Sequence, residues 1–177
     1  MNEQEQKIYT ELLVVRCQQG EKEAFESIVE LWQKPLLVFA WRYLDQETEA
    51  WDVVQETWVA AIKGLNKLQN PGLFVSWLFR VLTNKCIDRI RKKQTEEHLL
   101  KNTNVKLETL EISNESEFLS QAVQGLPDEQ KVLVMLRFGQ GLQIGQIAAI
   151  LNIAEGTVKS RLHRALARLR EILGDKI

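Results

Sequence analysis

Apolar residues recur at intervals of three and four along most of the chain, which is the pattern of amphipathic helices. The pattern is interrupted at residues 94–116, where Thr, Asn, Ser and Glu dominate and apolar residues follow no sustained period. It predicts helices at 8–19, 21–44, 47–64 and about 73–93, and, beyond the interruption, at about 118–126, 127–138, 142–151 and 154–172. We therefore expect an all-α protein in which two small helical domains, residues 1–93 and 117–177, are joined by a flexible acidic linker over 94–116.

The stretch from Leu142 to Leu173 predicts a helix, a tight turn and a second helix. Asn152 directly follows the first of these helices, at a position that favours a left-handed backbone conformation. The apolar positions of the second helix form one stripe, which consists of Val158, Leu162, Ala165, Leu166, Leu169 and Ile172. The C-terminal domain is therefore expected to contain a helix-turn-helix, whose second helix enters the major groove of DNA.

Positive and negative residues are unevenly distributed along the chain, although the net charge of the 177 residues is only −1. Residues 154–172 contain five Lys or Arg and two Glu, so the second helix of the predicted helix-turn-helix is basic. Taken by itself, this charge pattern is also typical of an ordinary amphipathic surface helix. The preceding helix and the short turn favour DNA binding.

Several classes of protein are not indicated by the sequence. No apolar run is long enough to span a membrane, and the acidic N-terminal residues differ from a signal peptide, so a cytoplasmic protein is expected. Cys17 and Cys86 fall on apolar helical positions and are expected to be reduced core thiols. His98 and His163 have no Cys or carboxylate at ligand spacing, and phosphate loops and nucleophile motifs are absent. We expect no metal, no cofactor, no small-molecule substrate and no enzymatic activity.

The predicted helix at 47–64 carries Asp52, Gln55 and Glu56 away from its apolar face. A solvated acidic face and a surface for a protein partner explain these three residues equally well.

The predicted helix that ends near residue 93 carries a polar arc. Arg80, Asn84, Asp88 and Arg91 follow Trp77 at spacings of three and four, so they share one side of the helix. Cations can hold a nucleic-acid backbone, amides can bond to exposed base edges, and an aromatic ring can support an unstacked base. Packing in the core is the alternative role for Trp77.

Four motifs resemble extracytoplasmic-function (ECF) sigma factors of the sigma-70 superfamily. The segment from Ile153 to Ala165 (IAEGTVKSRLHRA) resembles the recognition helix of sigma region 4, and Leu126–Gln130 resembles the opening of that region. Asp52–Trp58 (DVVQETW) resembles region 2.2, and Trp77–Arg91 resembles regions 2.3 and 2.4.

Two residues depart from the family's pattern. Ala154 stands where the family commonly has Ser as the helix N-cap, and Gln146 stands where it usually has Glu. Neither change removes a group that faces DNA, so both bear on stability more than on function.

The resemblance implies an alternative sigma factor that binds core RNA polymerase and directs initiation through the −35 and −10 promoter elements. The implied −35 contacts are Thr157, Lys159, Ser160, Arg161, His163, Arg164 and Arg168. The implied −10 contacts, including the preceding loop, are Asn70, Trp77, Arg80, Asn84, Asp88, Arg91 and Lys92. Asp52, Gln55 and Glu56 are the implied contacts with the clamp helices of the polymerase β′ subunit. By analogy with the family, an anti-sigma factor is a further expected partner.

Two other functions are compatible with a C-terminal helix-turn-helix. In a transcriptional regulator, residues 1–93 would sense a ligand or dimerise, but such a domain has no use for the Arg80–Arg91 arc. A metal or nucleotide enzyme with an appended DNA-binding domain lacks support, because the sequence has no ligand cluster.

Overall fold

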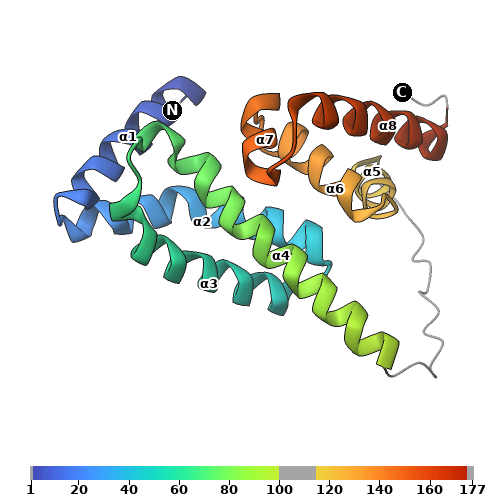
Figure 1. The fold of residues 1–177 in the computed structure, drawn as a ribbon, viewed down its shortest axis with the longest axis horizontal. Coiled ribbons are helices and arrows are strands. Elements are labelled where there is room, and N and C mark those ends of the chain that lie inside the picture. The colour runs from blue at the N-terminus through green and yellow to red at the C-terminus, as the bar shows by residue number, and fades with distance from the viewer. Residues whose placement is uncertain (1, 100–114, 175–177) are drawn as a thin grey trace. The chain divides into compact units, whose positions relative to one another are not determined.

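The computed structural model describes residues 2–99 and 115–174, and every element within these ranges is helical. The first region consists of α1 (Glu3–Gln18), α2 (Lys22–Leu44), α3 (Glu47–Gly64) and α4 (Phe74–Leu99) (Figure 1). The second region consists of α5 (Glu115–Gln124), α6 (Asp128–Val134), α7 (Ile144–Leu151) and α8 (Glu155–Leu173). The predicted all-α fold with two helical regions is confirmed. Most of the predicted linker, residues 100–114, lies outside the described residues.

Tight turns separate the first three helices. Gly20 has a φ of +93° between α1 and α2, a conformation that glycine adopts without steric cost. Asp45 caps α2 with a φ of +58°, and its amide donates to the Trp41 carbonyl oxygen at 2.8 Å. These turns fold α2 against α1 and α3 against α2.

Two helices are longer than the sequence pattern predicted. α1 begins at Glu3 because Asn2 and Glu5 form a capping box, in which each side chain accepts a hydrogen bond from the other's amide. α4 continues to Leu99, beyond the predicted end near residue 93 and into the segment assigned to the linker. The predicted domain limits themselves stay predictions.

Aromatic side chains form the core of the first region. Phe79 of α4 is fully buried, and its ring centroid lies 5.6 Å from that of Phe39 and 6.2 Å from that of Trp32, both in α2. The Phe25 ring of α2 meets Trp58 of α3 at a centroid distance of 5.9 Å. Edge-to-face pairs of this kind stabilise the contact beyond their buried area, so α2 is the helix on which α3 and α4 are assembled.

The second region is built around α6 and α8, which pack on each other and on α5. A π-helical turn, η3 (Met135–Gly139), continues α6 and carries the buried Leu136. Val158, Leu162, Ala165 and Leu169 of α8 are buried as predicted. Ile172 is 42% exposed, and Leu173 is buried in its place, so the predicted stripe is wrong at its C-terminal end.

Candidate nucleic-acid interface

The turn of the C-terminal helix-turn-helix has the predicted geometry. Asn152 follows α7 with a φ of +53°, which is the left-handed conformation. The Ile153 amide donates to the Ala148 carbonyl oxygen at 3.1 Å and thereby closes the end of α7. Ala148 and Val158, one on each helix, are both buried. This turn fixes where the basic helix α8 begins.

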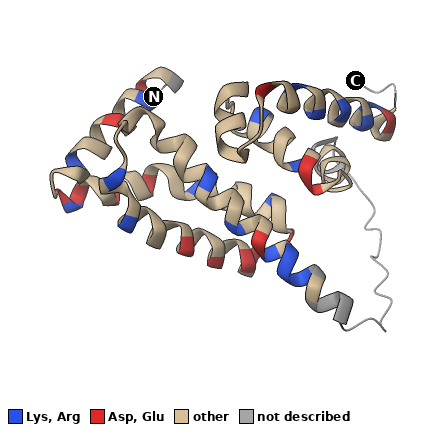
Figure 2. Ribbon diagram, viewed as in Figure 1, with Lys and Arg blue, Asp and Glu red and all other residues tan. Residues whose placement is uncertain are grey.

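α8 presents a basic surface, along which Figure 2 shows Lys and Arg recurring. Because its apolar stripe is buried, the positions between the stripe residues face outwards. Of the predicted −35 contacts, those with exposed side chains are Lys159, Ser160, His163, Arg164 and Arg168. Thr157 and Arg161 are half-buried.

Arg161 differs from the other basic residues of α8 because it is held by an acidic partner. Its Nη1 lies 3.0 Å from Oε2 of Glu129 in α6, so the pair connects these two helices. An ion pair this close to solvent contributes little stability. The geometry therefore supports a packing role for Arg161 over the implied −35 contact.

The first turn of α8 lacks a side-chain cap, as predicted from Ala154. Its backbone contributes the first bonds, since the Thr157 and Val158 amides donate to the Ala154 carbonyl oxygen at 2.9 and 3.1 Å. Gln146, the other departure from the family pattern, still caps the start of α7, because its Oε1 accepts a hydrogen bond from the Gln143 amide at 2.8 Å.

Polar side chains follow one exposed side of α4. Arg80, Asn84, Asp88 and Arg91 are all exposed, at the predicted spacings. Lys92 is exposed next to Arg91, and Figure 2 shows Lys and Arg gathered in the C-terminal half of α4. The exposed side of α4 therefore carries cations, one amide and one carboxylate, at the predicted positions.

Trp77 is a packing residue in this structure. Its ring lies over Gly64 at the end of α3, so closely that a Cβ at position 64 would be 2.6 Å from Cζ2 of the indole. The Phe74 ring centroid is 6.0 Å from that of Trp77. Of the two roles predicted for Trp77, these contacts favour packing.

Asn70 shapes the loop that precedes α4. Its Oδ1 accepts a hydrogen bond from the Gly72 amide at 2.9 Å, which makes a turn built on the Asn side chain. This turn starts η2 (Pro71–Leu73), and η1 (Leu65–Lys67) lies at the other end of the loop.

The acidic residues of α3 lie together on its surface. Asp52, Gln55 and Glu56 are exposed, and Oε2 of Glu56 lies 2.9 Å from Nζ of Lys85 in α4. This ion pair fixes one carboxylate beside α4.

Two apolar residues that the sequence-based site omitted continue the acidic face of α3. Val59 and Ile62 are 51% and 62% exposed. They follow Gln55 at spacings of four and three, so the helical period could have identified them. Exposed apolar side chains beside an acidic surface favour a protein partner over a solvated face.

The two cysteines are free thiols. Burial raises the pKa of Cys86 to about 12, and it also raises the pKa of the half-buried Cys17. In the part of the chain that the structure describes, no group of His, Cys, Asp or Glu is arranged to hold a metal ion. None of the described helices is long and apolar enough to cross a membrane.

The fold and the surface chemistry define an all-helical DNA-binding protein with two helical regions, of which the second contains a helix-turn-helix. Comparison with known proteins agrees with both parts. The family models for sigma-70 region 2 and sigma-70 region 4 match residues 28–96 and 118–169.

Full-length relatives and solved structures cover both regions. The ECF RNA polymerase sigma factor SigW of Bacillus subtilis is 30% identical over 178 residues, which cover 92% of this chain and 95% of SigW. The sigma factor RpoE of Bartonella quintana, solved with the anti-sigma factor NepR, has a TM-score of 0.74 at 25% identity and covers 86% of this chain and 98% of RpoE. CnrH, solved with the cytosolic domain of CnrY, has a TM-score of 0.71 at 25% identity over 96% of this chain and 99% of CnrH.

The chain belongs to the ECF family of RNA polymerase sigma factors. It is therefore an alternative sigma factor, a transcription initiation factor, and the interpretation as a ligand-sensing regulator is not favoured.

Proposed function

We propose that this sigma factor divides promoter recognition between α8 and α4 and binds polymerase through α3. The observation that carries the proposal is the exposed basic surface of α8, the second helix of a helix-turn-helix of the predicted geometry. A helix held in this way can enter the major groove with its N-terminal half.

At the −35 element, Lys159, Ser160, His163 and Arg164 would contact base edges. The side chains of Lys159 and His163 bond to no other described residue, so they would enter an interface without losing an internal partner. Thr157 and Arg168 would contact phosphate, while Arg161 supports α8 through Glu129.

At the −10 element, the exposed side of α4 would hold one DNA strand. Arg80, Arg91 and Lys92 supply charge for the backbone, and Asn84 can bond to an exposed base edge. Asp88 accepts hydrogen bonds only, so it would discriminate between base edges by their donors. The loop with Asn70 would receive a base that leaves the stack.

The proposed polymerase contact is the surface formed by Asp52, Gln55, Glu56, Val59 and Ile62 of α3. Carboxylates steer a basic partner, and the two apolar residues supply area that is removed from water on binding. The proposed occupant is the pair of clamp helices of the β′ subunit.

The remaining partners follow from the family. Because RpoE and CnrH were both solved with a second protein, RpoE with an anti-sigma factor, we propose that an anti-sigma factor also binds this chain. The polymerase would perform the chemistry of initiation and this chain none, and both would act in the cytoplasm.

The experiment that tests the proposal removes two cations from α8. Lys159→Ala with Arg164→Ala should lower initiation from promoters with a −35 element by at least about tenfold, because each good base contact contributes about 1–3 kcal/mol of discrimination. The affinity for core polymerase should stay unchanged.

A matched control removes the same charge elsewhere. Lys22 and Lys34 are exposed on α2, so Lys22→Ala with Lys34→Ala should leave initiation intact. Equal losses in the two double variants, or loss of polymerase binding in the first, would refute the assignment of α8.

A further inference from the structure

The loop between α3 and α4 has few bonds of its own. Within it, the Leu68 amide donates to the Leu65 carbonyl oxygen at 3.1 Å and the Leu73 amide to the Asn70 carbonyl oxygen at 3.0 Å. Each of these bonds, like that from the Gly72 amide to Oδ1 of Asn70, closes one short turn, and among the described residues none of the three connects the two turns. The position of the loop therefore depends on what lies against it.

α1 supplies that support through Gln18. Its Nε2 donates to the Leu65 carbonyl oxygen at 3.1 Å and to the Leu68 carbonyl oxygen at 2.8 Å. A carboxamide nitrogen has two hydrogens, and both are used here, because both partners can only accept. One side chain thus fixes the η1 turn at its beginning and at its end.

A second contact from α1 reaches the other end of the loop. A carboxylate oxygen of Glu11 lies 3.2 Å from the point that a Cβ on Gly72 would occupy, and α1 contacts η2 as well as η1. Glu11 and Gln18 are seven residues apart, so they lie on the same side of α1 at a separation of about 10 Å. The fully buried Val14 lies between them on this side.

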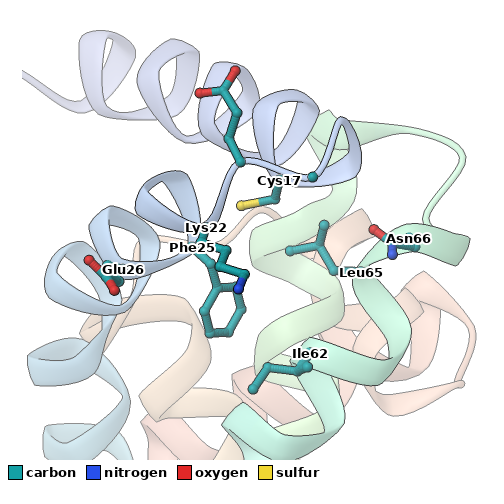
Figure 3. A pocket seen from close by; sticks show the side chains of 9 residues that line it. Cys17, Lys22, Phe25, Glu26, Ile62, Leu65 and Asn66 are labelled. Carbon is teal, nitrogen blue, oxygen red and sulfur yellow. The ribbon is translucent and has the colours of Figure 1, made fainter.

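A hollow lies beside η1, between the end of α1, the start of α2 and the end of α3. A pocket of about 340 Å³ lies there, lined by Cys17, Phe25, Ile62, Leu65 and Asn66 among others (Figure 3). Because protein interiors are normally close-packed, such a hollow leaves room for the turn to move. The turn itself is held by the two hydrogen bonds from Gln18.

We infer that Gln18 is a positioning residue for recognition of the −10 element and that α1 serves as the anchor of the base-receiving loop. The inference rests on the proposed role of this loop. A receptor for an unstacked base must hold its backbone in place to distinguish one base from another, and α1 provides this constraint without touching DNA.

The test measures base selectivity with the full chain and core polymerase. Templates that differ only in the base at one −10 position are transcribed with wild type, Gln18→Met and Gln18→Glu. Met keeps the length of the side chain but has no donor, and Glu would place acceptors against the two carbonyl groups. We expect the ratio between the best and the worst base to fall about tenfold in Gln18→Met, and at least as far in Gln18→Glu, because two hydrogen bonds are lost.

Gln19→Met is the matched control, since Gln19 is the exposed neighbour and has no bond to the loop. It should keep the wild-type ratio, and all variants should keep polymerase affinity within about twofold. If Gln18→Met kept the wild-type ratio between the best and the worst base, the inference would be overturned but the proposed function would not. An equal loss of activity on all templates would overturn it too, because that is the result of a folding defect. A wild-type protein without base preference at any −10 position would overturn the proposed function as well.

Discussion

Ala154 leaves the first turn of α8 weakly capped. It occupies the N-cap of α8 without a side-chain acceptor, and only backbone bonds close the first turn. Ala154→Ser should stabilise α8 by about 1 kcal/mol, because a serine hydroxyl accepts from an amide of that turn. Hydrogen exchange of the α8 amides should slow about fivefold. An unchanged exchange rate would mean that the introduced hydroxyl makes no such bond.

A control for this prediction places serine where no cap is needed. Ala149 is exposed within α7, and Ala149→Ser should leave the α8 amides unaffected, since the new hydroxyl would be remote from them.

Cys86 predicts a pH dependence. The pKa of its thiol is raised by burial to about 12 from an ordinary value of 9.0, so the folded chain keeps a proton that the unfolded chain releases. Below pH 9 the thiol is protonated in both the folded and the unfolded chain, so it adds no pH dependence to the free energy of unfolding. Between pH 9 and 12 the free energy of unfolding should fall by up to about 1.4 kcal/mol per pH unit from this thiol alone.

Tryptophan fluorescence can follow this loss, because all five Trp residues lie between positions 32 and 77. Cys86→Ala should reduce the slope of stability against pH by one proton, whatever its effect on the absolute stability. Cys17→Ala should reduce it less, because that thiol is only half-buried. Identical slopes in wild type and Cys86→Ala would contradict the assigned burial.

At the scale of the element, α3 carries the prediction that separates polymerase binding from DNA binding. Asp52→Lys with Glu56→Lys reverses two charges on its exposed surface and should lower the affinity for core polymerase by at least about tenfold. The basic surface of α8 is unchanged by these substitutions. A binding assay with labelled core polymerase measures the affinity.

Two controls accompany this measurement. Glu26→Lys with Glu30→Lys makes the same charge change on the exposed side of α2 and should have little effect. Lys85→Ala removes only the ion pair with Glu56, and it shows how much that pair contributes by itself. Wild-type affinity in the Asp52/Glu56 variant would reject α3 as the contact surface.

The order and the type of the helices could be predicted from the sequence, because apolar spacing decides which face is buried. The helix ends that depend on polar groups could not be predicted in this way. α1 starts early because of the Asn2–Glu5 capping box, and α4 extends to Leu99 through a segment that has no apolar stripe but contains the good helix formers Gln94, Glu96 and Glu97. Ile172 and Leu173 are neighbours of equal hydrophobicity, so only packing decides which one is buried.

The candidate site could be predicted as a set of exposed positions, but the bonds between elements could not. The periodicity of α4 and α8 placed Arg80, Asn84, Lys159 and Arg164 on outer faces, and all four are exposed. Sequence spacing within one helix contains no information on the ion pair between Arg161 and Glu129, or on the support of the loop by Gln18.

At the scale of the whole molecule, a chain of net charge −1 carries its proposed DNA contacts on two helices, α4 and α8, along which Lys and Arg recur. A chain with a net charge near zero has little general attraction for DNA. In the proposed function, its two basic surfaces act together only when a partner protein holds both of them at one promoter. We propose that this partner is core polymerase, bound through α3.

The most direct test of this account is run-off transcription with purified bacterial core polymerase on a pool of genomic fragments, with and without the protein. We predict initiation that requires the chain, at sites that share two separated sequence motifs. Absence of initiation, together with tight binding of the protein alone to duplex operators, would contradict the account and point to a regulator.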